Sequence, residues 1–289
     1  MLAYLRKNID ITNLSWYKTP AVANYYFEIN TLDDIDKLSE IYNFCIKNNL
    51  KFNIVAEGTN IFFVFERYTW VIIKNNLRWY KINSWDADLF SWENISEFCR
   101  ILKDEHEINN LYPWIWLPWT VGWAVYWNAW CFRLRMEDLF ITWKVLDLRT
   151  WKILIADKEW MCFSYRESIL KKERNYFLID CKINISKNIE TVSYEEVINF
   201  RETKQPKWNS CWSVFINNPD FPASWKLIED AWLKWFRVWK AFISPIHANF
   251  IIAEEWIKSK DILELIFEVK KIIKDKYWVE LQEEINKFI

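Results

Sequence analysis

The most constraining feature of this sequence is its shortage of glycine: its 289 residues include only 2 Gly but 22 Trp. A domain of this length ordinarily has about 20 glycines, because average usage is roughly 7%. Many turns need a residue that accepts a positive φ, and glycine does so without steric cost. A chain with two glycines therefore has few ways to build the usual turns.

Tryptophan occupies places where glycine is typical. Trp151 lies between two β-rich runs, Trp278 follows a helix-like stretch, and Trp119 lies in a proline-containing loop. We hypothesise that the gene uses UGA as a glycine codon, which a table reading UGA as Trp would print as tryptophan. A truly Trp-rich protein is the alternative, and UGG at all 22 positions would establish it. We call the chain with glycine at all 22 positions the glycine-decoded chain.

The charge balance excludes one class of function. The chain has 38 Lys and Arg against 39 Asp and Glu, a formal net charge of −1. A protein that binds nucleic acid electrostatically normally carries a basic surplus, so no nucleic-acid partner is expected. Charged residues make up 27% and apolar residues 52%. These fractions and the length predict a globular chain of one to three domains.

Neither a metal centre nor a membrane span is expected. Six cysteines are scattered without CxxC spacing, which predicts reduced thiols, and His106 and His247 are the two histidines. The uncharged stretch 108–132 is long enough to cross a bilayer. It contains Pro113, Pro118 and six tryptophans, and with glycine at those six positions it becomes a loop and strand segment. The N-terminus lacks a secretory signal pattern, so a cytoplasmic protein is expected.

Local patterns predict a mixture of helices and strands. Apolar residues recur at helical spacing over 31–49 and 260–277, and helices are also expected over 93–107 and 194–203. Apolar strand-like runs occur over 52–55, 61–65 and repeatedly between 143 and 185. The mixture predicts an α+β fold with segregated sub-domains.

Two segments have the composition of phosphate-binding loops. The turn 56–60 joins two predicted strands and offers backbone N–H groups, the Thr59 hydroxyl and the Asn60 amide. Such a run of donors suits a diphosphate, although a plain β-turn is the alternative. With glycine restored, the segment 112–132 would let backbone amides approach a dinucleotide without interfering side chains. The alternative there is a tight packing corner.

These segments, with four others, resemble the motifs of the UDP-N-acetylenolpyruvoylglucosamine reductase family. The motifs are Glu57-Gly-Thr-Asn60, Leu117-Pro-Trp-Thr-Val-Gly122, Asn128-Ala-Trp130, Phe163-Ser-Tyr-Arg-Glu-Ser168, Trp212-Ser-Val-Phe-Ile-Asn-Asn-Pro219 and His247-Ala-Asn-Phe250. The resemblance extends from about Asn13 to Ile285. Each Trp inside these motifs stands where the family has glycine, which supports the recoding hypothesis.

The resemblance implies an FAD-binding two-subdomain fold of the vanillyl-alcohol-oxidase/PCMH type, followed by a C-terminal α+β substrate-binding domain. It implies FAD-binding sub-domains over 1–78 and 79–190 and the substrate domain over 191–289. The residues that match the family's FAD contacts are Glu57, Gly58, Thr59, Asn60, Pro118, Thr120, Gly122 and Asn128. Ala56 stands where many relatives have glycine, and Cys131-Phe132-Arg133 also departs from the family pattern.

The resemblance also implies a reaction. Family members use NADPH to reduce FAD, and the flavin then gives hydride to C3 of the enolpyruvyl group of UDP-N-acetylglucosamine-enolpyruvate. The product is UDP-N-acetylmuramate, a peptidoglycan precursor. Ser213 matches the family's proton donor to C2, and Arg166 and Glu284 match the arginine and glutamate around the substrate carboxylate. A guanidinium fork suits a carboxylate, and a supported serine can deliver a proton.

Further residues match contacts to the rest of the substrate. Lys204 matches a lysine near the diphosphate, Asn217 an asparagine on the uridine-diphosphate part, and Tyr165 is expected beside the flavin or the substrate. His247 is expected to be mainly structural. Ile216 replaces a frequent lysine, and the chain resembles the shorter type that lacks an inserted loop over the substrate. A monomer is expected.

Three alternatives to this reductase stay open from the sequence. The chain could be another FAD oxidoreductase of the same wider fold, or a non-catalytic nucleotide-binding relative. Taken literally, the 22 Trp could instead form stacking platforms of a glycan-binding protein. The printed chain with all its tryptophans is expected to misfold and not to bind FAD, because overpacking destabilises a well-packed site.

Overall fold

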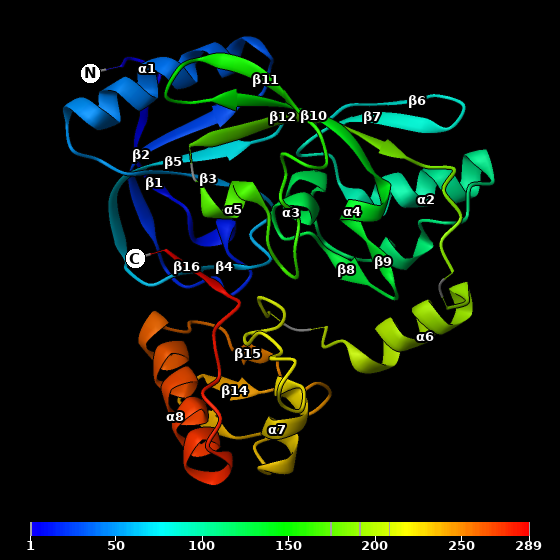
Figure 1. Cartoon of the computed structure of the whole chain (residues 1–289). Coiled ribbons are helices and arrows are strands. Elements are labelled where there is room, and N and C mark those ends of the chain that lie inside the picture. The colour runs from blue at the N-terminus through cyan, green and yellow to red at the C-terminus, as the bar shows by residue number, and fades with distance from the viewer. Residues whose placement is uncertain (1, 174, 191, 208, 289) are drawn as a thin grey trace. The chain divides into compact units, whose positions relative to one another are not determined.

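The computed structural model describes residues 2–173, 175–190, 192–207 and 209–288 (Figure 1). The chain divides into two compact units. Unit 1 comprises Met1–Leu5, Phe27–Ala56 and Ile73–Asn199. Unit 2 comprises Arg6–Tyr26, Glu57–Ile72 and Phe200–Ile289. Each unit therefore combines segments that are far apart in the sequence.

A five-stranded antiparallel sheet forms the centre of unit 1, with strand order β11-β10-β12-β7-β6. Its strands are β6 (Tyr80–Ile82), β7 (Asp86–Phe90), β10 (Phe140–Asp147), β11 (Lys152–Ala156) and β12 (Tyr176–Asn184). A short ribbon pairs β8 (Trp130–Cys131) with β9 (Leu134–Arg135). Leu89, Val145 and Ile183 are fully buried, so the sheet supplies much of the core of this unit.

Several helices belong to unit 1. They are α1 (Asp33–Lys47), α2 (Ile95–His106), α3 (Val121–Tyr126), α4 (Met136–Leu139), α5 (Ile169–Lys172) and the one-turn η2 (Tyr112–Trp114). Helix α6 (Tyr194–Lys204) begins in unit 1 and ends in unit 2. In α1, Tyr42 packs edge-on against Phe52 and Trp151. Helix α2 begins at Asn94, whose side chain accepts the Glu97 N–H, a normal helix N-cap.

A second sheet has the strand order β1-β2-β5-β3. Its strands are β1 (Arg6–Asp10), β2 (Val22–Ile29), β3 (Phe52–Val55) and β5 (Arg67–Asn75). Strand β1 pairs antiparallel with the part of β2 that belongs to unit 2. Strands β2 and β5 each contain residues of both units.

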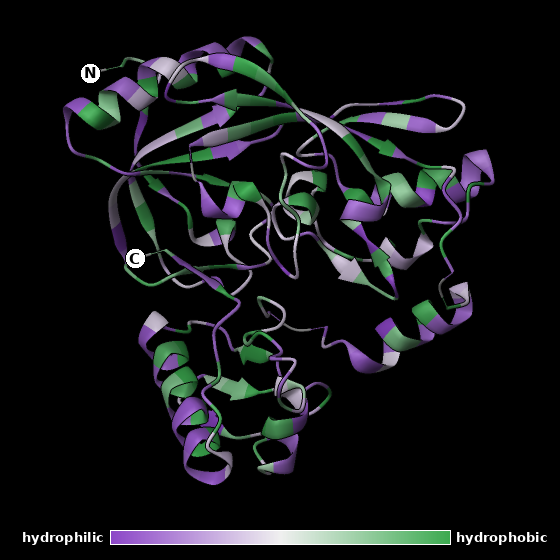
Figure 2. Ribbon diagram, viewed as in Figure 1, coloured by the Kyte–Doolittle hydropathy of each residue, from purple (hydrophilic) through white to green (hydrophobic). Residues whose placement is uncertain are grey.

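Unit 2 has its own core around α8 (Ser259–Tyr277). Ile262, Leu265 and Val269 on α8 are fully buried, together with Phe62 and Phe215. Figure 2 shows hydrophobic and hydrophilic residues alternating along α8, as an amphipathic helix requires. The other elements are η1 (Thr12–Leu14), α7 (Ser224–Asp230), a sheet of β13 (Arg237–Val238), β14 (Ala241–Ile243) and β15 (Ile251–Ala253), and the parallel pair β4 (Ile61–Phe63) and β16 (Asn286–Phe288).

Most of the predicted elements are confirmed. Helices occur at α1, α2, α6 and α8, and strands at β3 and β4, although β4 ends at Phe63. The β-rich region from 143 to 185 also contains α5. The prediction of only loop and strand within 108–132 is wrong, because η2 and α3 lie there. Thr120 explains α3, since its hydroxyl accepts the Trp123 N–H at 3.1 Å and caps the helix. Within the described ranges, no helix is both long and apolar enough to cross a membrane.

Candidate functional site

The turn 57–60 in unit 2 has a backbone that only glycine can adopt. Gly58 has φ +73°, and a Cβ added there would lie 2.2 Å from the Leu14 carbonyl oxygen. The Gly58 carbonyl accepts the Trp16 N–H at 3.1 Å. The turn is therefore packed tightly against the chain at residues 14–16, and its shape depends on the missing side chain.

The same turn presents unused backbone donors. Gly58 and Thr59 are buried. Within the described residues, nothing accepts a hydrogen bond from their backbone N–H groups or from that of Asn60. Buried N–H groups are nearly always paired. Successive backbone donors without a partner among the described residues are the kind of group that can bind a phosphate.

Asn60 connects this turn to the C-terminal segment of unit 2. Its amide nitrogen lies 3.4 Å from the Glu284 carbonyl oxygen, and its own carbonyl accepts the Asn286 N–H at 3.1 Å. Asn60 is followed by β4, which runs parallel to β16. The proposed phosphate turn and the segment that carries Glu284 are thus parts of one hydrogen-bonded backbone network.

Ser213 belongs to the same network. The Glu284 N–H donates to the Val214 carbonyl at 2.7 Å, and Ser213 forms a β-bridge with Phe250. The segment that contains Ser213 therefore has the Glu284 segment on one side and Phe250 on the other. Trp212, just before Ser213, has φ +64°, so the chain turns sharply where it enters this segment.

Cys211 fills the space beneath the turn. Its thiol donates to the Ile61 carbonyl at 3.2 Å and lies 3.7 Å from the Ser15 hydroxyl. Burial raises the pKa of the Cys211 thiol to about 12, despite opposing hydrogen bonds. The thiol therefore stays neutral, and a packing role fits it better than nucleophilic chemistry. Sequence reasoning missed Ser15 and Cys211 as supports of the turn, because they are about 200 residues apart.

Glu283 and Glu284 differ in their surroundings. Glu283 forms ion pairs with Lys270 at 3.0 Å and Lys287 at 2.7 Å. Burial raises the pKa of Glu283, but these two lysines outweigh it and lower the pKa overall. Glu283 is thus a structural carboxylate, and it provides a natural control for Glu284.

The two residues predicted to contact the nucleotide end of the substrate lie at the surface of unit 2. Lys204 is exposed at the last position of α6. Asn217 is also exposed, and its side-chain oxygen accepts the Ser224 N–H at 2.9 Å, at the start of α7. A charged amine and an oriented amide at the surface are suited to a diphosphate and a nucleobase.

In unit 1, the motif around Gly122 packs closely on β7. A Cβ at Gly122 would lie 2.8 Å from the Ser91 carbonyl oxygen. Pro118 is half-buried, and Thr120 is buried as the cap of α3. Asn128, also buried, donates to the Ser164 carbonyl at 3.0 Å and accepts the Glu137 N–H at 3.1 Å. Asn128 therefore holds two loops together with both ends of its amide.

The loop that Asn128 holds carries Tyr165 and Arg166. Ser164 and Glu167 exchange backbone hydrogen bonds at 3.2 Å, and this tight loop holds Arg166 at φ +57°. The Arg166 guanidinium lies 5.9 Å from the Tyr165 ring centre, and the Tyr165 ring contacts Trp130 edge-on. Tyr165 is 46% exposed. An aromatic ring and a guanidinium are thus presented side by side.

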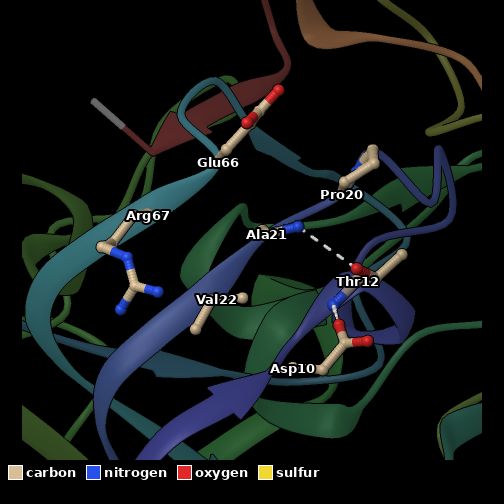
Figure 3. Close-up of a pocket in the computed structure, with 7 residues that line it drawn as sticks. All are labelled: Asp10, Thr12, Pro20, Ala21, Val22, Glu66 and Arg67. Carbon is tan, nitrogen blue, oxygen red and sulfur yellow. Dashed lines mark hydrogen bonds between the residues drawn. The ribbon is translucent and has the colours of Figure 1, made fainter.

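A pocket of about 340 Å³ in unit 2 contains none of these residues (Figure 3). It is lined by Asp10, Thr12, Pro20, Ala21, Val22, Glu66 and Arg67. The Ala21 N–H donates to the Thr12 hydroxyl at 3.1 Å, and the Thr12 N–H donates to the Asp10 carboxylate at 2.8 Å. These polar groups satisfy one another, so the pocket is a weaker candidate than the turn 57–60.

Comparisons with known proteins assign the chain to a class. A family model described as UDP-N-acetylenolpyruvoylglucosamine reductase, C-terminal domain, matches residues 204–288. The crystal structure of that reductase from Thermus caldophilus covers 99% of this chain, with 100% of its own length aligned, a TM-score of 0.75 and 19% identity. The predicted α+β fold is confirmed, and it is the fold of that reductase.

Sequence relatives identify the family. The enzyme of this name from Petrotoga mobilis is 32% identical over 249 residues, covering 83% of this chain and 81% of the relative. That from Fervidobacterium nodosum is 31% identical, covering 86% and 81%. The chain belongs to the UDP-N-acetylenolpyruvoylglucosamine reductase family, whose enzymes use FAD and NADPH. Membership of an enzyme family contradicts the glycan-binding alternative.

Proposed function

We propose that this chain reduces UDP-N-acetylglucosamine-enolpyruvate to UDP-N-acetylmuramate in peptidoglycan synthesis, with FAD as cofactor and NADPH as reductant. The observation that carries the proposal is the backbone network of unit 2. In it, the Glu284 N–H bonds to Val214, next to Ser213, while Asn60 connects Glu284 to a turn with unpaired donors. The turn predicted to bind FAD and the segments that carry Ser213 and Glu284 are thus connected by hydrogen bonds within unit 2.

The turn 57–60 is the proposed diphosphate site. The N–H groups of Gly58, Thr59 and Asn60 would hold the negative charge of the FAD diphosphate, with Glu57 in the same turn. In unit 1, Pro118, Thr120, Gly122 and Asn128 are proposed to shape the second FAD-binding segment. Gly122 fits this role because a side chain there would collide with Ser91.

The proposed catalytic residues are Ser213, Glu284 and Arg166. FAD supplies the hydride chemistry when bound. Ser213 donates a proton to C2 of the enolpyruvyl group, and Glu284 supports the serine oxygen as its proton leaves. Arg166 binds the substrate carboxylate through its guanidinium fork. Tyr165, Lys204 and Asn217 are proposed to contact the remainder of the substrate.

The proposed domains are FAD-binding sub-domains over 1–78 and 79–190 and a substrate domain over 191–289. The match of a C-terminal-domain family model to residues 204–288 supports the last of these. A cytoplasmic location and a monomeric state also stay predictions of the sequence. Size-exclusion chromatography with light scattering tests the monomer.

A spectroscopic titration of the purified glycine-decoded chain tests the function. We expect bound flavin bands in the visible spectrum, bleaching by NADPH without oxygen, and recovery of the bands when the enolpyruvyl substrate is added. Mass spectrometry should then detect UDP-N-acetylmuramate. A folded chain that takes up FAD but is not reoxidised by this substrate would favour another FAD oxidoreductase of the same fold.

Ser213→Ala separates proton donation from cofactor reduction. We expect bleaching by NADPH to be preserved, while reoxidation by the substrate slows by about 10²–10⁴-fold, the usual range for loss of a general acid. Ser210→Ala is the matched control. Ser210 is a nearby serine that is buried, whereas Ser213 is half-buried, and the Ser210 hydroxyl has no hydrogen-bond partner in the described part of the chain. Equal rates in the two variants would remove Ser213 from the mechanism.

A further inference from the structure

Tryptophan recurs where the backbone is left-handed. Of the 17 non-glycine residues with positive φ in the described ranges, eight are tryptophans. They are Trp116, Trp151, Trp212, Trp232, Trp235, Trp239, Trp256 and Trp278, with φ between +49° and +66°. This region is uncommon for residues with a Cβ, apart from a moderate enrichment of Asn, Asp and His. A large aromatic residue has no reason to concentrate there, whereas glycine does.

Two of these tryptophans end helices. Trp278 is the left-handed residue after α8, and its N–H donates to the Lys274 carbonyl at 2.9 Å. Trp232 lies two residues after the last residue of α7, and its N–H donates to the Glu229 carbonyl at 2.9 Å. This position after a helix is the one most enriched in glycine. The two side chains are 87% and 89% exposed, so burial of the indole rings does not explain their presence.

Two others lie in hairpin loops. Trp239 is the first residue of the two-residue loop between Val238 and Ala241, which pair across β13 and β14. A positive φ at this position is typical of a type II′ turn, where glycine is standard. Trp151 closes the loop between β10 and β11, donating to the Asp147 carbonyl at 2.8 Å. Left-handed residues in such loops are also usually glycine.

A separate observation concerns three tryptophans inside unit 1. Trp114, Trp127 and Trp143 are buried, and their indole N–H groups have no hydrogen-bond partner in the described residues. Buried indoles normally find an acceptor. By contrast, the Trp92 indole donates to the Val55 carbonyl at 3.2 Å. A residue without a side chain would leave no such donor at the three positions.

We infer that the natural protein carries glycine at the eight left-handed positions, and that the decoding is codon-wide and so extends to Trp114, Trp127 and Trp143. The inference rests on backbone angles and unpaired donors and is independent of the proposed function. It predicts that UGA encodes these residues. Peptide mass spectrometry of the protein from its source cells should find glycine in the peptides that span them. Tryptophan masses there, or UGG codons, would overturn the inference.

The requirement for glycine at the eight left-handed positions can be tested separately from the effect of removing the indole rings. Two forms of the glycine-decoded chain are compared: the chain itself, with glycine at the eight left-handed positions, and a variant with alanine at those eight positions. Both lack the indole rings, but only glycine accepts a positive φ freely. We expect the glycine form to have the higher melting temperature. An alanine variant of equal or higher melting temperature would show that the positions do not require glycine.

A different observation identifies a residue that positions the Ser213 segment. Asn249 is 3% exposed. Its side-chain oxygen accepts the Phe215 N–H at 2.9 Å, and its side-chain nitrogen donates to the Phe215 carbonyl at 2.8 Å. Its backbone carbonyl accepts the Val214 N–H at 2.9 Å. The amide of Asn249 therefore pairs with Phe215 as a neighbouring strand would.

The neighbours of Asn249 fix its own position. Its N–H donates to Nδ1 of His247 at 3.2 Å, and the buried Ser244 hydroxyl accepts the N–H groups of Ile246 and His247. Burial lowers the pKa of His247 to about 4, so its imidazole is neutral and can accept this hydrogen bond. This agrees with the expected structural role of His247.

The geometry points to Asn249 as a positioning residue for proton donation by Ser213, an inference that rests on the proposed function. Asn249 does not touch the reacting atoms. It holds Val214 and Phe215, and the backbone of these residues sets the direction of Ser213. Loss of this amide should lower kcat and leave the KM for NADPH unchanged.

Two variants of the glycine-decoded chain test the role. Asn249→Ala removes both side-chain hydrogen bonds, and we expect kcat to fall at least tenfold. Asn249→Asp can still accept the Phe215 N–H, but it donates to the Phe215 carbonyl only when protonated, because the carboxylic acid then donates where the amide did. Its kcat relative to wild type should therefore rise as the pH falls, and that of Asn249→Ala should not.

Asn75→Ala is the control for a purely structural effect. Asn75 is similarly buried and accepts the Leu77 N–H at 2.9 Å in unit 1. If Asn75→Ala lowers kcat as much as Asn249→Ala, or if Asn249→Asp shows no pH-dependent recovery, the positioning role is refuted. Failure of the proposed function would look different, because the unmodified chain would then not turn over the enolpyruvyl substrate.

Discussion

Adding one methyl group at Gly58 should strongly lower the stability of the fold. Alanine at Gly58 would occupy φ +73°, with its Cβ 2.2 Å from the Leu14 oxygen and 2.7 Å from the Leu14 carbonyl carbon. The left-handed backbone costs about 1–2 kcal/mol for a residue with a Cβ. Relieving the overlap with fixed backbone atoms costs about 1–3 kcal/mol more. Gly58→Ala should therefore destabilise the glycine-decoded chain by about 2–5 kcal/mol.

Two measurements check this value. At this chain length 1 kcal/mol corresponds to about 2–4 °C in melting temperature, so the melting temperature should fall by about 4–20 °C. Because the turn must move away from Leu14, its unpaired N–H groups also move. Each hydrogen bond to a charged group contributes about 1.5–3 kcal/mol. Loss of one should weaken FAD binding at least about tenfold in a fluorescence titration.

Ala56→Gly is the control for the Gly58 experiment, since it changes the residue directly before the turn without adding an atom. Its expected cost is about 1 kcal/mol or less, from backbone entropy alone. A Gly58→Ala variant with the melting temperature and FAD affinity of the unmodified chain would refute the close packing on Leu14. Normal stability with weakened FAD binding would refute only the steric part, and would still place the cofactor at this turn.

Three further outcomes are expected. Glu284→Gln should lower kcat by at least about 10²-fold. Glu283→Gln, which loses two ion pairs, should lower the melting temperature but not kcat. Equal kcat losses for the two variants in steady-state assays would contradict the catalytic role of Glu284. Burial raises the pKa of Asp34, but hydrogen bonds, above all from Lys37, outweigh it and lower the pKa to about 2. Asp34 thus contributes stability above about pH 4 that is lost as the pH falls toward 2, and Asp34→Asn should cost about 1–2 kcal/mol at pH 7 in urea unfolding. Burial lowers the pKa of His247 to about 4, so between about pH 6.5 and 4 the unfolded chain binds a proton that the folded chain does not. The free energy of unfolding should therefore decrease as the pH falls from about 6.5 to 4, and it should decrease less in His247→Gln.

Local patterns in the sequence predict α1 and α8 because the apolar residues of these helices recur every three to four positions. Helix α8 shows this, with Ile262, Leu265, Ile266 and Val269 buried on one face. Helix α3 was not predicted, because the tryptophans and prolines around it hide the short capped turn at Thr120. A local sequence pattern does not predict the structure of a segment whose residue types rarely adopt the backbone conformation found there.

The candidate site was predicted only as a set of residues. The motif around Gly58 indicates a turn, and the resemblance names Ser213 and Glu284, but neither predicts that the chain near its end pairs with both. Strand β16 lies parallel to β4, more than 220 residues away, and parallel pairing of distant segments leaves no local signal in a sequence. The hydrogen bonds of Asn249 to Phe215 are not predicted for the same reason. The sequence around a buried asparagine does not indicate which distant backbone groups its amide will bond.

The left-handed backbone at residue 212 directly precedes Ser213, the proposed proton donor. Trp212 has φ +64° and connects the buried Cys211 to Ser213, and its ring lies 5.9 Å from that of Phe250. Because Phe250 also bridges to Ser213, strain at residue 212 acts on the proposed proton donor. In the glycine-decoded chain, returning this one position to tryptophan should lower both the melting temperature and kcat. Alanine at 212 should also lower both the melting temperature and kcat, because it too carries a Cβ. If alanine there matched glycine in both measurements, the site would need only a small side chain at this position, and the left-handed backbone before Ser213 would have no role in catalysis.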